Sequence, residues 1–177
     1  VRLTGCHLRC TYCDTEYAFK EGGSREIDEI LAEVLGHPSD LVEITGGEPL
    51  LQPGVHDLVR RLCDAGRTVL IETSGACDIS VCDPRAIRIL DLKTPGSGEA
   101  ERNLMENLDE LTERDEVKFV VTDRDDNVYI HNQSKDGVVI FDREGTFLGS
   151  WGEEYADGAH GFNINEENGT EYLYITD

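Results

Sequence analysis

Hydrophobic residues recur along the first two thirds of the chain in two patterns, one typical of helices and one typical of short strands. After Ser24, residues 27–35 carry isoleucine, leucine or valine at i, i+3, i+4, i+7 and i+8, which predicts an amphipathic helix. Short apolar runs that end at glycine or polar residues predict strands. We expect further helices after Pro53 and around 99–111, and strands over 1–3, 41–45, 68–72, 86–90 and 116–121.

Strands that alternate with helices favour an α/β fold with a parallel sheet and right-handed crossovers. Ligands of such sheets bind beyond the carboxyl ends of the strands. Polar or glycine-rich motifs directly follow four of the expected strands, so we expect them to share one rim of the sheet. These motifs are residues 5–15, Gly46-Gly47-Glu48, Glu72-Thr73-Ser74 and Asp91-Leu92-Lys93.

From about residue 123 the pattern changes to short β runs separated by Asp, Asn and Gly turns, which predicts a small antiparallel β segment. Tyr129 and Tyr174 lie in similar contexts, at a spacing typical of propeller blades. Residues 139–152 resemble an NHL-type propeller repeat. One blade cannot bury both faces of its sheet, so residues 124–177 should be weakly folded unless they pack on the first part.

This change predicts two domains, 1–123 and 124–177, with a junction near residues 122–126. The junction is either a natural fusion or an assembly error that joins two genes, and we favour the error. Residues 1–3 have the composition of a strand already under way in a chain that does not begin with Met, so we also expect a truncated N-terminus.

Charge and cysteine content narrow the function classes. Lys and Arg number 16 against 37 Asp and Glu, a formal charge of -21, which would repel a phosphate backbone and argues against nucleic acid as a partner. No signal peptide or long apolar run is visible, so we expect no membrane association. The clustered cysteines favour reduced thiols and a cytoplasmic location. We interpret Cys63, Cys77 and Cys82 as structural.

Cys6, Cys10 and Cys13 form a C-x3-C-x2-C pattern that is too compact for a helix or strand, so we expect them on one loop. A structural zinc site normally needs four ligands, and His7 is an awkward fourth because it adjoins Cys6. Three thiolates suit a cubic iron-sulfur cluster whose fourth iron is left open. We favour the cluster over a zinc site or a disulfide.

The cysteine pattern together with residues 46–49, Gly-Gly-Glu-Pro, resembles the radical S-adenosylmethionine (SAM) superfamily. Within it, Arg2 and the segments 13–15, 44–50 and 71–75 resemble the 7-carboxy-7-deazaguanine synthases of the queuosine pathway. The resemblance covers about residues 1–123. It implies a partial radical-SAM (βα) barrel that is truncated at its N-terminus and lacks its C-terminal closure.

The resemblance also implies roles for individual residues. Cys6, Cys10 and Cys13 would hold the 4Fe-4S cluster, Thr15 would bind Mg²⁺, and Arg2 and Thr45 would contact the substrate. The family often has Ser-Pro-Lys where this chain has residues 91–93, and an ion pair between Asp91 and Lys93 is an open alternative there. Contacts to SAM are implied for Tyr12, Cys13, Asp14, Gly47, Glu48, Asp91, Leu92 and Lys93, with weaker support for Ser74.

The activity implied is conversion of 6-carboxy-5,6,7,8-tetrahydropterin to 7-carboxy-7-deazaguanine by a radical SAM lyase. This reaction needs a low-potential electron donor such as a flavodoxin or ferredoxin, and the enzyme could be a homodimer. Two alternatives stay open. One is another radical SAM enzyme, such as an activase of a glycyl-radical enzyme. The other is a non-catalytic zinc-binding protein whose propeller segment binds partners.

Overall fold

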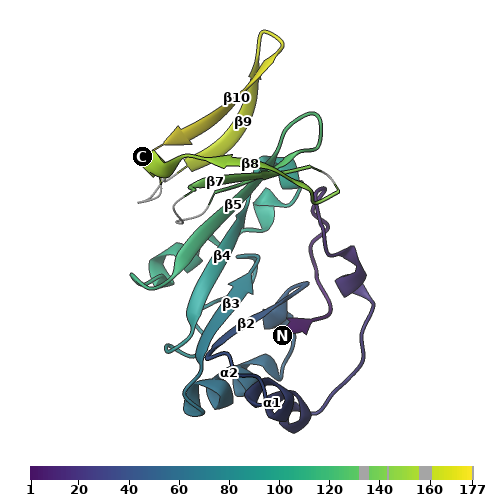
Figure 1. The fold of residues 1–177 in the computed structure, drawn as a ribbon, viewed down its shortest axis with the longest axis vertical. Helices are drawn as coiled ribbons and strands as arrows, with labels where there is room; N and C mark the ends of the chain where they lie inside the picture. Colours follow the sequence, from purple (N-terminus) through teal and green to yellow (C-terminus); the bar gives the residue numbers. More distant parts are fainter. Residues whose placement is uncertain (132–135, 143, 156–160, 177) are drawn as a thin grey trace. The chain divides into compact units, whose positions relative to one another are not determined.

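The computed structural model describes residues 1–131, 136–142, 144–155 and 161–176 (Figure 1). Contacts along the chain divide it into two compact units. The first unit contains residues 1–9, 13–90 and 102–116. The second unit contains residues 10–12, 91–101 and 117–177.

The first unit is built on parallel strands in chain order, as the alternating pattern predicts. These are β1 (Arg2–Leu3), β2 (Leu41–Gly46), β3 (Thr68–Thr73) and β4 (Ile87–Lys93), of which residues 87–90 belong to this unit. The register pairs Leu3 with Gly46 and Ile44 with Ile71. Because all four strands run the same way, their carboxyl ends share one edge of the sheet.

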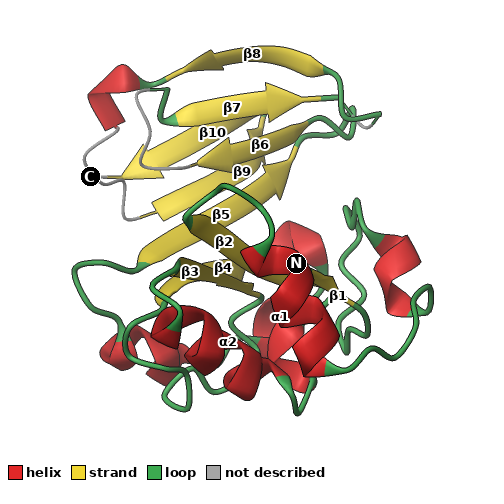
Figure 2. Cartoon of the chain, turned by 60° about the horizontal axis from the view of Figure 1, so that its bottom comes forward, coloured by secondary structure: helices red, strands yellow, loops and turns green. Residues whose placement is uncertain are grey.

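Two helices carry the apolar faces that the sequence predicts, α1 (Ile27–Leu35) and α2 (Val55–Asp64). They lie side by side, and α2 packs against β3 (Figure 2). The helices begin two to three residues later than Ser24 and Pro53 suggest. Together with the strands they form the core of the unit, whose buried residues include Val42, Ile44, Leu58, Val59, Leu62, Val69 and Ile71.

The helix predicted around 99–111 is wrong. This stretch forms short 3₁₀ turns at Ala100–Arg102 and Met105–Glu110. The apolar residues Leu104 and Leu108 are 39% and 38% exposed, whereas the polar Asn107 is buried. The segment instead supplies polar groups to the loop that follows β3, and an amphipathic helix would not present them there. The connection from β3 to β4 likewise contains no helix.

The second unit is antiparallel, as the short β runs predict. β5 (Glu116–Thr122), β6 (Val128–His131), β7 (Val138–Phe141) and β8 (Phe147–Trp151) pair in order, and β9 (Gly161–Glu167) forms a hairpin with β10 (Thr170–Thr176). Its small core consists of Val121, Val138 and Phe162 with partly buried neighbours.

The boundary expected near residue 123 falls in the turn that joins β5 to β6, where Thr122 pairs with Val128. Residues on both sides of it therefore share one sheet. The division into domains of different origin stays a prediction, as does the propeller-repeat resemblance. Arg143, within that resemblance, lies outside the described residues.

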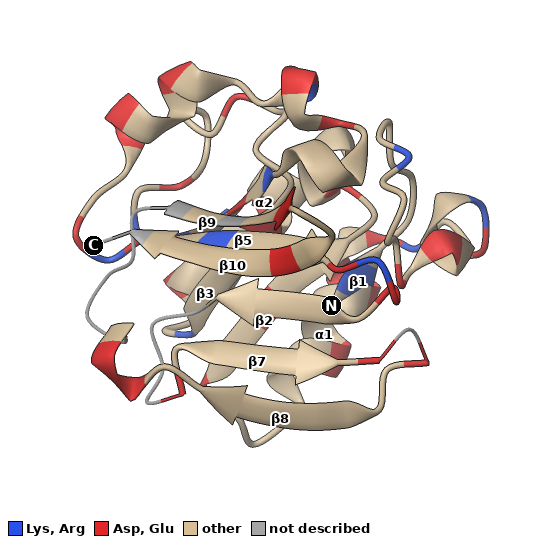
Figure 3. Cartoon of the chain, turned by 90° about the horizontal axis from the view of Figure 1, so that it is seen from above, with Lys and Arg blue, Asp and Glu red and all other residues tan. Residues whose placement is uncertain are grey.

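The sequence has 37 Asp and Glu against 16 Lys and Arg, and Figure 3 marks the positions of both kinds along the ribbon. Within the described ranges, no helix has the length and hydropathy needed to cross a membrane.

Candidate functional site

The first limb of the cysteine loop is fixed by backbone hydrogen bonds within the first unit. Gly5 N donates to Ala18 O at 2.8 Å, and Glu48 N donates to Gly5 O at 2.8 Å. Cys6 follows directly and is partly buried. Burial raises the pKa of its thiol above the ordinary value. These two backbone hydrogen bonds tie the start of the loop to residues 16–19 and to the Gly-Gly-Glu motif.

Glycine is required at both positions of that motif because other backbone lies against it. A Cβ added at Gly46 would collide with Leu3 O. One added at Gly47 would collide with Gly5 O and lie 2.8 Å from the Cys6 Cβ. The sequence predicts a close backbone approach at this pair. The structure identifies the partners: β1 approaches Gly46, and the cysteine loop approaches Gly47.

Glu48 is fully buried at the edge where β2 and β3 end. Its Oε1 accepts hydrogen bonds from Leu50 N at 3.0 Å and Thr73 Oγ1 at 2.9 Å. Its Oε2 accepts from Ser74 N at 2.8 Å and from Ser74 Oγ at 2.5 Å. All four donors are neutral groups. They hold the carboxylate in place and leave its charge without a cationic counterpart among these contacts.

The two predicted substrate residues lie at the same edge of the first unit. Thr45 Oγ1 donates to Glu72 Oε2 at 3.2 Å across β2 and β3. Arg2 Nη1 donates to Gly46 O at 3.4 Å, so its guanidinium is held beside the glycine pair. The motifs of β1, β2 and β3 are therefore brought together, as the parallel order predicts.

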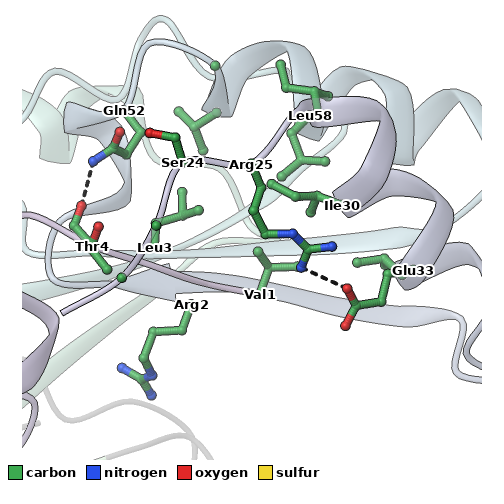
Figure 4. Close-up of a pocket in the computed structure, with 16 residues that line it drawn as sticks. Val1, Arg2, Leu3, Thr4, Ser24, Arg25, Ile30, Glu33, Gln52 and Leu58 are labelled. Carbon is green, nitrogen blue, oxygen red and sulfur yellow. Dashed lines mark hydrogen bonds and ion pairs between the residues drawn. The ribbon is translucent and has the colours of Figure 1, made fainter.

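A pocket of about 560 Å³ lies between β1, residues 22–25, α1 and the start of α2 (Figure 4). An ion pair between Arg25 and Glu33, at 2.8 Å, lines it. Arg2 is the one predicted site residue in its lining, and its side chain is directed away from the other labelled side chains (Figure 4). The pocket is thus distinct from the edge that carries Glu48.

The last limb of the cysteine loop carries the predicted magnesium ligand. Cys13 Sγ and Thr15 Oγ1 are 3.8 Å apart within hydrogen-bonding contact. Asp14, between them, is exposed. A hydroxyl and a neighbouring carboxylate are oxygen donors of the kind that Mg²⁺ prefers.

In the second unit, Asp91 and Lys93 form a buried ion pair rather than an exposed one. Lys93 Nζ lies 2.8 Å from Asp91 Oδ2, and the side chains are 10% and 13% exposed. Burial opposes the charge on Lys93, but the Asp91 carboxylate outweighs it and raises the pKa of the ammonium. Leu92, between them, is buried.

Two buried polar atoms here have no hydrogen-bond partner among the described residues. They are Tyr12 OH and the second carboxylate oxygen of the pair, Asp91 Oδ1. Burial also raises the pKa of Tyr12, and Lys93 and Asp91 both act on it electrostatically. Unpaired buried polar atoms are costly, so these two atoms are available to a polar ligand.

Cys10 belongs to the second unit, where its neighbour Thr11 is tied to the turn that follows β4. Thr11 N donates to Ser97 O at 3.0 Å, and Thr11 Oγ1 donates to Gly96 O at 2.6 Å. Ser97 is fully buried, which makes the turn a firm anchor.

All six cysteines are free thiols. Burial raises the pKa of both Cys77 and Cys82 to about 11, which favours the unreactive thiol and agrees with structural roles. Across the described part of the chain, no three His, Cys, Asp or Glu side chains are grouped as metal ligands. The three loop cysteines are divided between the units, with Cys6 and Cys13 in the first and Cys10 in the second.

The sequence placed Thr73 in a motif at the rim of the sheet but gave it no role, and it did not point to Asn107; both are buried polar residues. Thr73 directly precedes a predicted contact residue, and its place at a strand end was the available signal. Asn107 lies 33 residues beyond Ser74, inside a stretch whose leucines favoured a helix. No local pattern pointed to it.

Comparison with known proteins matches residues 1–92 to the radical SAM superfamily. The chain is 51% identical to a 7-carboxy-7-deazaguanine synthase of Koribacter versatilis, over 71% of this chain and 57% of the relative. It is 45% identical to the Chlorobaculum tepidum enzyme of the same name, over 73% and 60%.

The fold resembles the crystal structure of QueE from Escherichia coli, with a TM-score of 0.53 and 26% sequence identity. That likeness covers 69% of this chain and 61% of the solved chain. The chain thus spans somewhat more than half the length of the curated relatives that it matches.

Proposed function

Because the chain belongs to the radical SAM superfamily, we propose that it is the radical SAM core of a 7-carboxy-7-deazaguanine synthase. Its substrate would be 6-carboxy-5,6,7,8-tetrahydropterin. The observation that carries the proposal is the packing of Gly47 against Gly5 and Cys6, which joins the cysteine loop to the Gly-Gly-Glu motif. Relatives that bear this enzyme's name at 42–51% identity support it.

Membership of the superfamily and likeness to these relatives imply a 4Fe-4S cluster, SAM and Mg²⁺ as cofactors. The donors present fit a cluster in type and number, since Cys6, Cys10 and Cys13 are free thiols on one short loop, but their side chains are not grouped in this structure and would have to converge around it. When bound, the cluster and SAM would supply the radical chemistry of hydrogen abstraction. The protein's part is to hold these groups and to exclude water.

The proposed SAM contacts in the first unit are Cys13, Asp14, Gly47 and Glu48. The buried Glu48 carboxylate accepts hydrogen bonds from neutral donors only, in the contacts described above, so its charge favours a cation beside it. SAM offers such cations in its ammonium and sulfonium groups. Ser74, which donates to the same carboxylate, would fix its orientation.

The proposed SAM contacts in the second unit are Tyr12, Asp91, Leu92 and Lys93. Tyr12 OH would donate or accept a hydrogen bond with a polar group of SAM, and Asp91 Oδ1 would accept one. Lys93 is already neutralised by Asp91, so it would act as a hydrogen-bond donor more than as a free positive charge.

The substrate carboxylate would bind Arg2, whose guanidinium already faces the strand ends through Gly46 O. Thr45 would contact the substrate beside it, and Thr15 would supply one oxygen ligand to Mg²⁺. The proposal includes a low-potential protein donor such as a flavodoxin or ferredoxin, a cytoplasmic location and assembly as a homodimer.

The first test of this function is metal content after anaerobic reconstitution of the wild type and of Cys10→Ala. We expect about four iron and four sulfide per wild-type chain and loss of the intact cluster in the variant. Cys63→Ala is the matched control, since Cys63 lies on α2 and should leave the iron content unchanged. Zinc without sulfide in the wild type would overturn the proposal in favour of a zinc-binding protein.

The second test identifies the substrate. Reconstituted protein, a reductant, SAM and Mg²⁺ are incubated with 6-carboxytetrahydropterin, and the deazaguanine product is measured by mass spectrometry. Formation of 7-carboxy-7-deazaguanine supports the proposal. SAM cleavage that never depends on the pterin would favour another radical SAM activity.

A further inference from the structure

The loop that follows β3, residues 75–79, is held by one buried side chain from a distant part of the first unit. Asn107 is 3% exposed. Its Nδ2 donates to Gly75 O at 3.0 Å and to Cys77 O at 2.8 Å, and its Oδ1 accepts from Ile79 N at 3.2 Å. Both donor hydrogens and the acceptor of one amide are therefore used on one short loop.

The Asn107 segment adds a backbone contact to the same loop, because Leu104 N also donates to Gly75 O, at 2.9 Å. Gly75 has φ +74°, a conformation that L residues rarely adopt, so the chain turns sharply at this point. Nothing within 75–79 belongs to a strand. Without Asn107, the carbonyls of Gly75 and Cys77 would lose this partner inside the protein.

The loop begins one residue after Ser74, and Ser74 orients the Glu48 carboxylate through its N–H and its hydroxyl. Because Gly75 is bonded to Ser74, a shift of Gly75 would also displace the backbone of Ser74. Ser74 and Thr73 supply three of the four hydrogen bonds to Glu48 described above. Asn107 is thus linked to the Glu48 carboxylate through Gly75 and Ser74.

We infer that Asn107 is a positioning residue for SAM, acting through the 75–79 loop and Ser74 on Glu48. The inference rests on the proposed function, because it assumes that Glu48 and Ser74 face SAM. An asparagine is needed because the site demands two donors and one acceptor in a small volume. Aspartate has the same shape but would face the carbonyls of Gly75 and Cys77 with acceptor oxygens.

The test compares SAM binding by cluster-loaded wild type and Asn107→Asp, using equilibrium dialysis and the SAM-induced change in the EPR spectrum of the reduced protein. We expect SAM to bind about tenfold more weakly to the variant, the scale set by two lost buried hydrogen bonds. Iron and sulfide content should stay at the wild-type level, because no cysteine ligand has been changed.

Asp115→Asn is the control for a merely structural effect. Asp115 is as deeply buried, accepts from Arg88 and Thr112, and has no hydrogen bond to Ser74 or Glu48. It should lower stability at neutral pH and leave the SAM dissociation constant within twofold of the wild type. Equal SAM affinity in Asn107→Asp and wild type would overturn the inference.

A double-mutant cycle with Ser74→Ala tests the route. If Asn107 acts through Ser74, the two substitutions together should weaken SAM binding by clearly less than the product of their separate effects. Effects that multiply fully would contradict this route.

If Asn107→Asp does not fold, amide hydrogen exchange of the wild type tests whether the 75–79 loop responds to SAM. SAM should slow exchange at residues 75–79, and unchanged exchange there would overturn the inference. Failure of the loaded wild type to bind SAM at all is a separate result, since it would overturn the proposed function before any variant is made.

Discussion

The two units bury their apolar side chains to different extents. In the first unit, helices and parallel strands enclose a core in which Leu62, Ile44 and Val69 are fully buried. In the second unit, β8 and β10 leave large apolar residues in solvent, and Leu148 is 54% exposed. Parallel sheets need cover on their faces, whereas antiparallel sheets tolerate an open face.

Polar side chains are buried in some places and exposed in others. The first unit encloses Glu48 and the pair of Arg88 with Asp115, each with several hydrogen bonds. In the second unit, Arg124 pairs with Glu166 and Glu171 at the surface, with 48% of its side chain exposed. The Asp91–Lys93 pair shows that the second unit buries charged groups as well, so the contrast lies between buried pairs and surface pairs and does not follow the division into units.

Truncating a leucine should give the largest difference in lost stability between the two units. Leu62→Ala opens a cavity in the first unit and should lower the free energy of unfolding by about 2–5 kcal/mol. Leu148→Ala removes an exposed side chain from β8 and should change it by less than about 0.5 kcal/mol. Denaturant unfolding, with hydrogen exchange at β2 and β3, measures both. Similar losses for the two variants would break the comparison.

Removing one partner of an ion pair should give a smaller difference in lost stability, again with the larger loss at the buried site. Asp115→Asn leaves Arg88 buried and should cost about 3 kcal/mol at pH 7. Glu166→Gln weakens a surface pair and should cost less than about 1 kcal/mol. Denaturant unfolding of both variants at pH 7 measures the two losses, and an equal cost would show that burial does not set the value of these pairs.

The stability that Asp115→Asn removes should also depend on pH. Burial alone would raise the pKa of Asp115, but its hydrogen bonds with Arg88 and Thr112 outweigh this and lower it. A lowered pKa means that the stabilisation is present above the unfolded value, near 4, and is lost as the pH falls further. The gap between wild type and Asp115→Asn should therefore narrow below about pH 4. A gap that stays constant with acidification would contradict the assigned charge.

Much of the first unit could be predicted from local patterns, because its helices and strands bury one face with a regular period. The periodicity located α1, α2 and the strands, and the strand order brought Arg2, Thr45 and the Gly-Gly-Glu motif to one edge. The prediction of a helix over 99–111 was wrong for a physical reason. Its leucines repeat like a helix face, but its buried residue is Asn107, whose partners are backbone groups 28 to 32 positions away.

The contacts that shape the candidate site were equally invisible in the sequence. Nothing local indicates that Glu48 is held by Thr73 and Ser74, or that Gly47 packs on Cys6 rather than only on a ligand. The burial of the Asp91–Lys93 pair could not be predicted either, since the same residues at a surface would form a solvated pair. Such features depend on which segments meet, and only tertiary structure specifies that.

The most direct test of the central claim is EPR of the anaerobically reconstituted, dithionite-reduced chain, recorded with and without SAM. The account predicts the signal of a 4Fe-4S cluster that changes when SAM is added, because the fourth iron is left open by three cysteine ligands. A cluster signal that SAM leaves unchanged, or zinc in place of iron and sulfide, would contradict it.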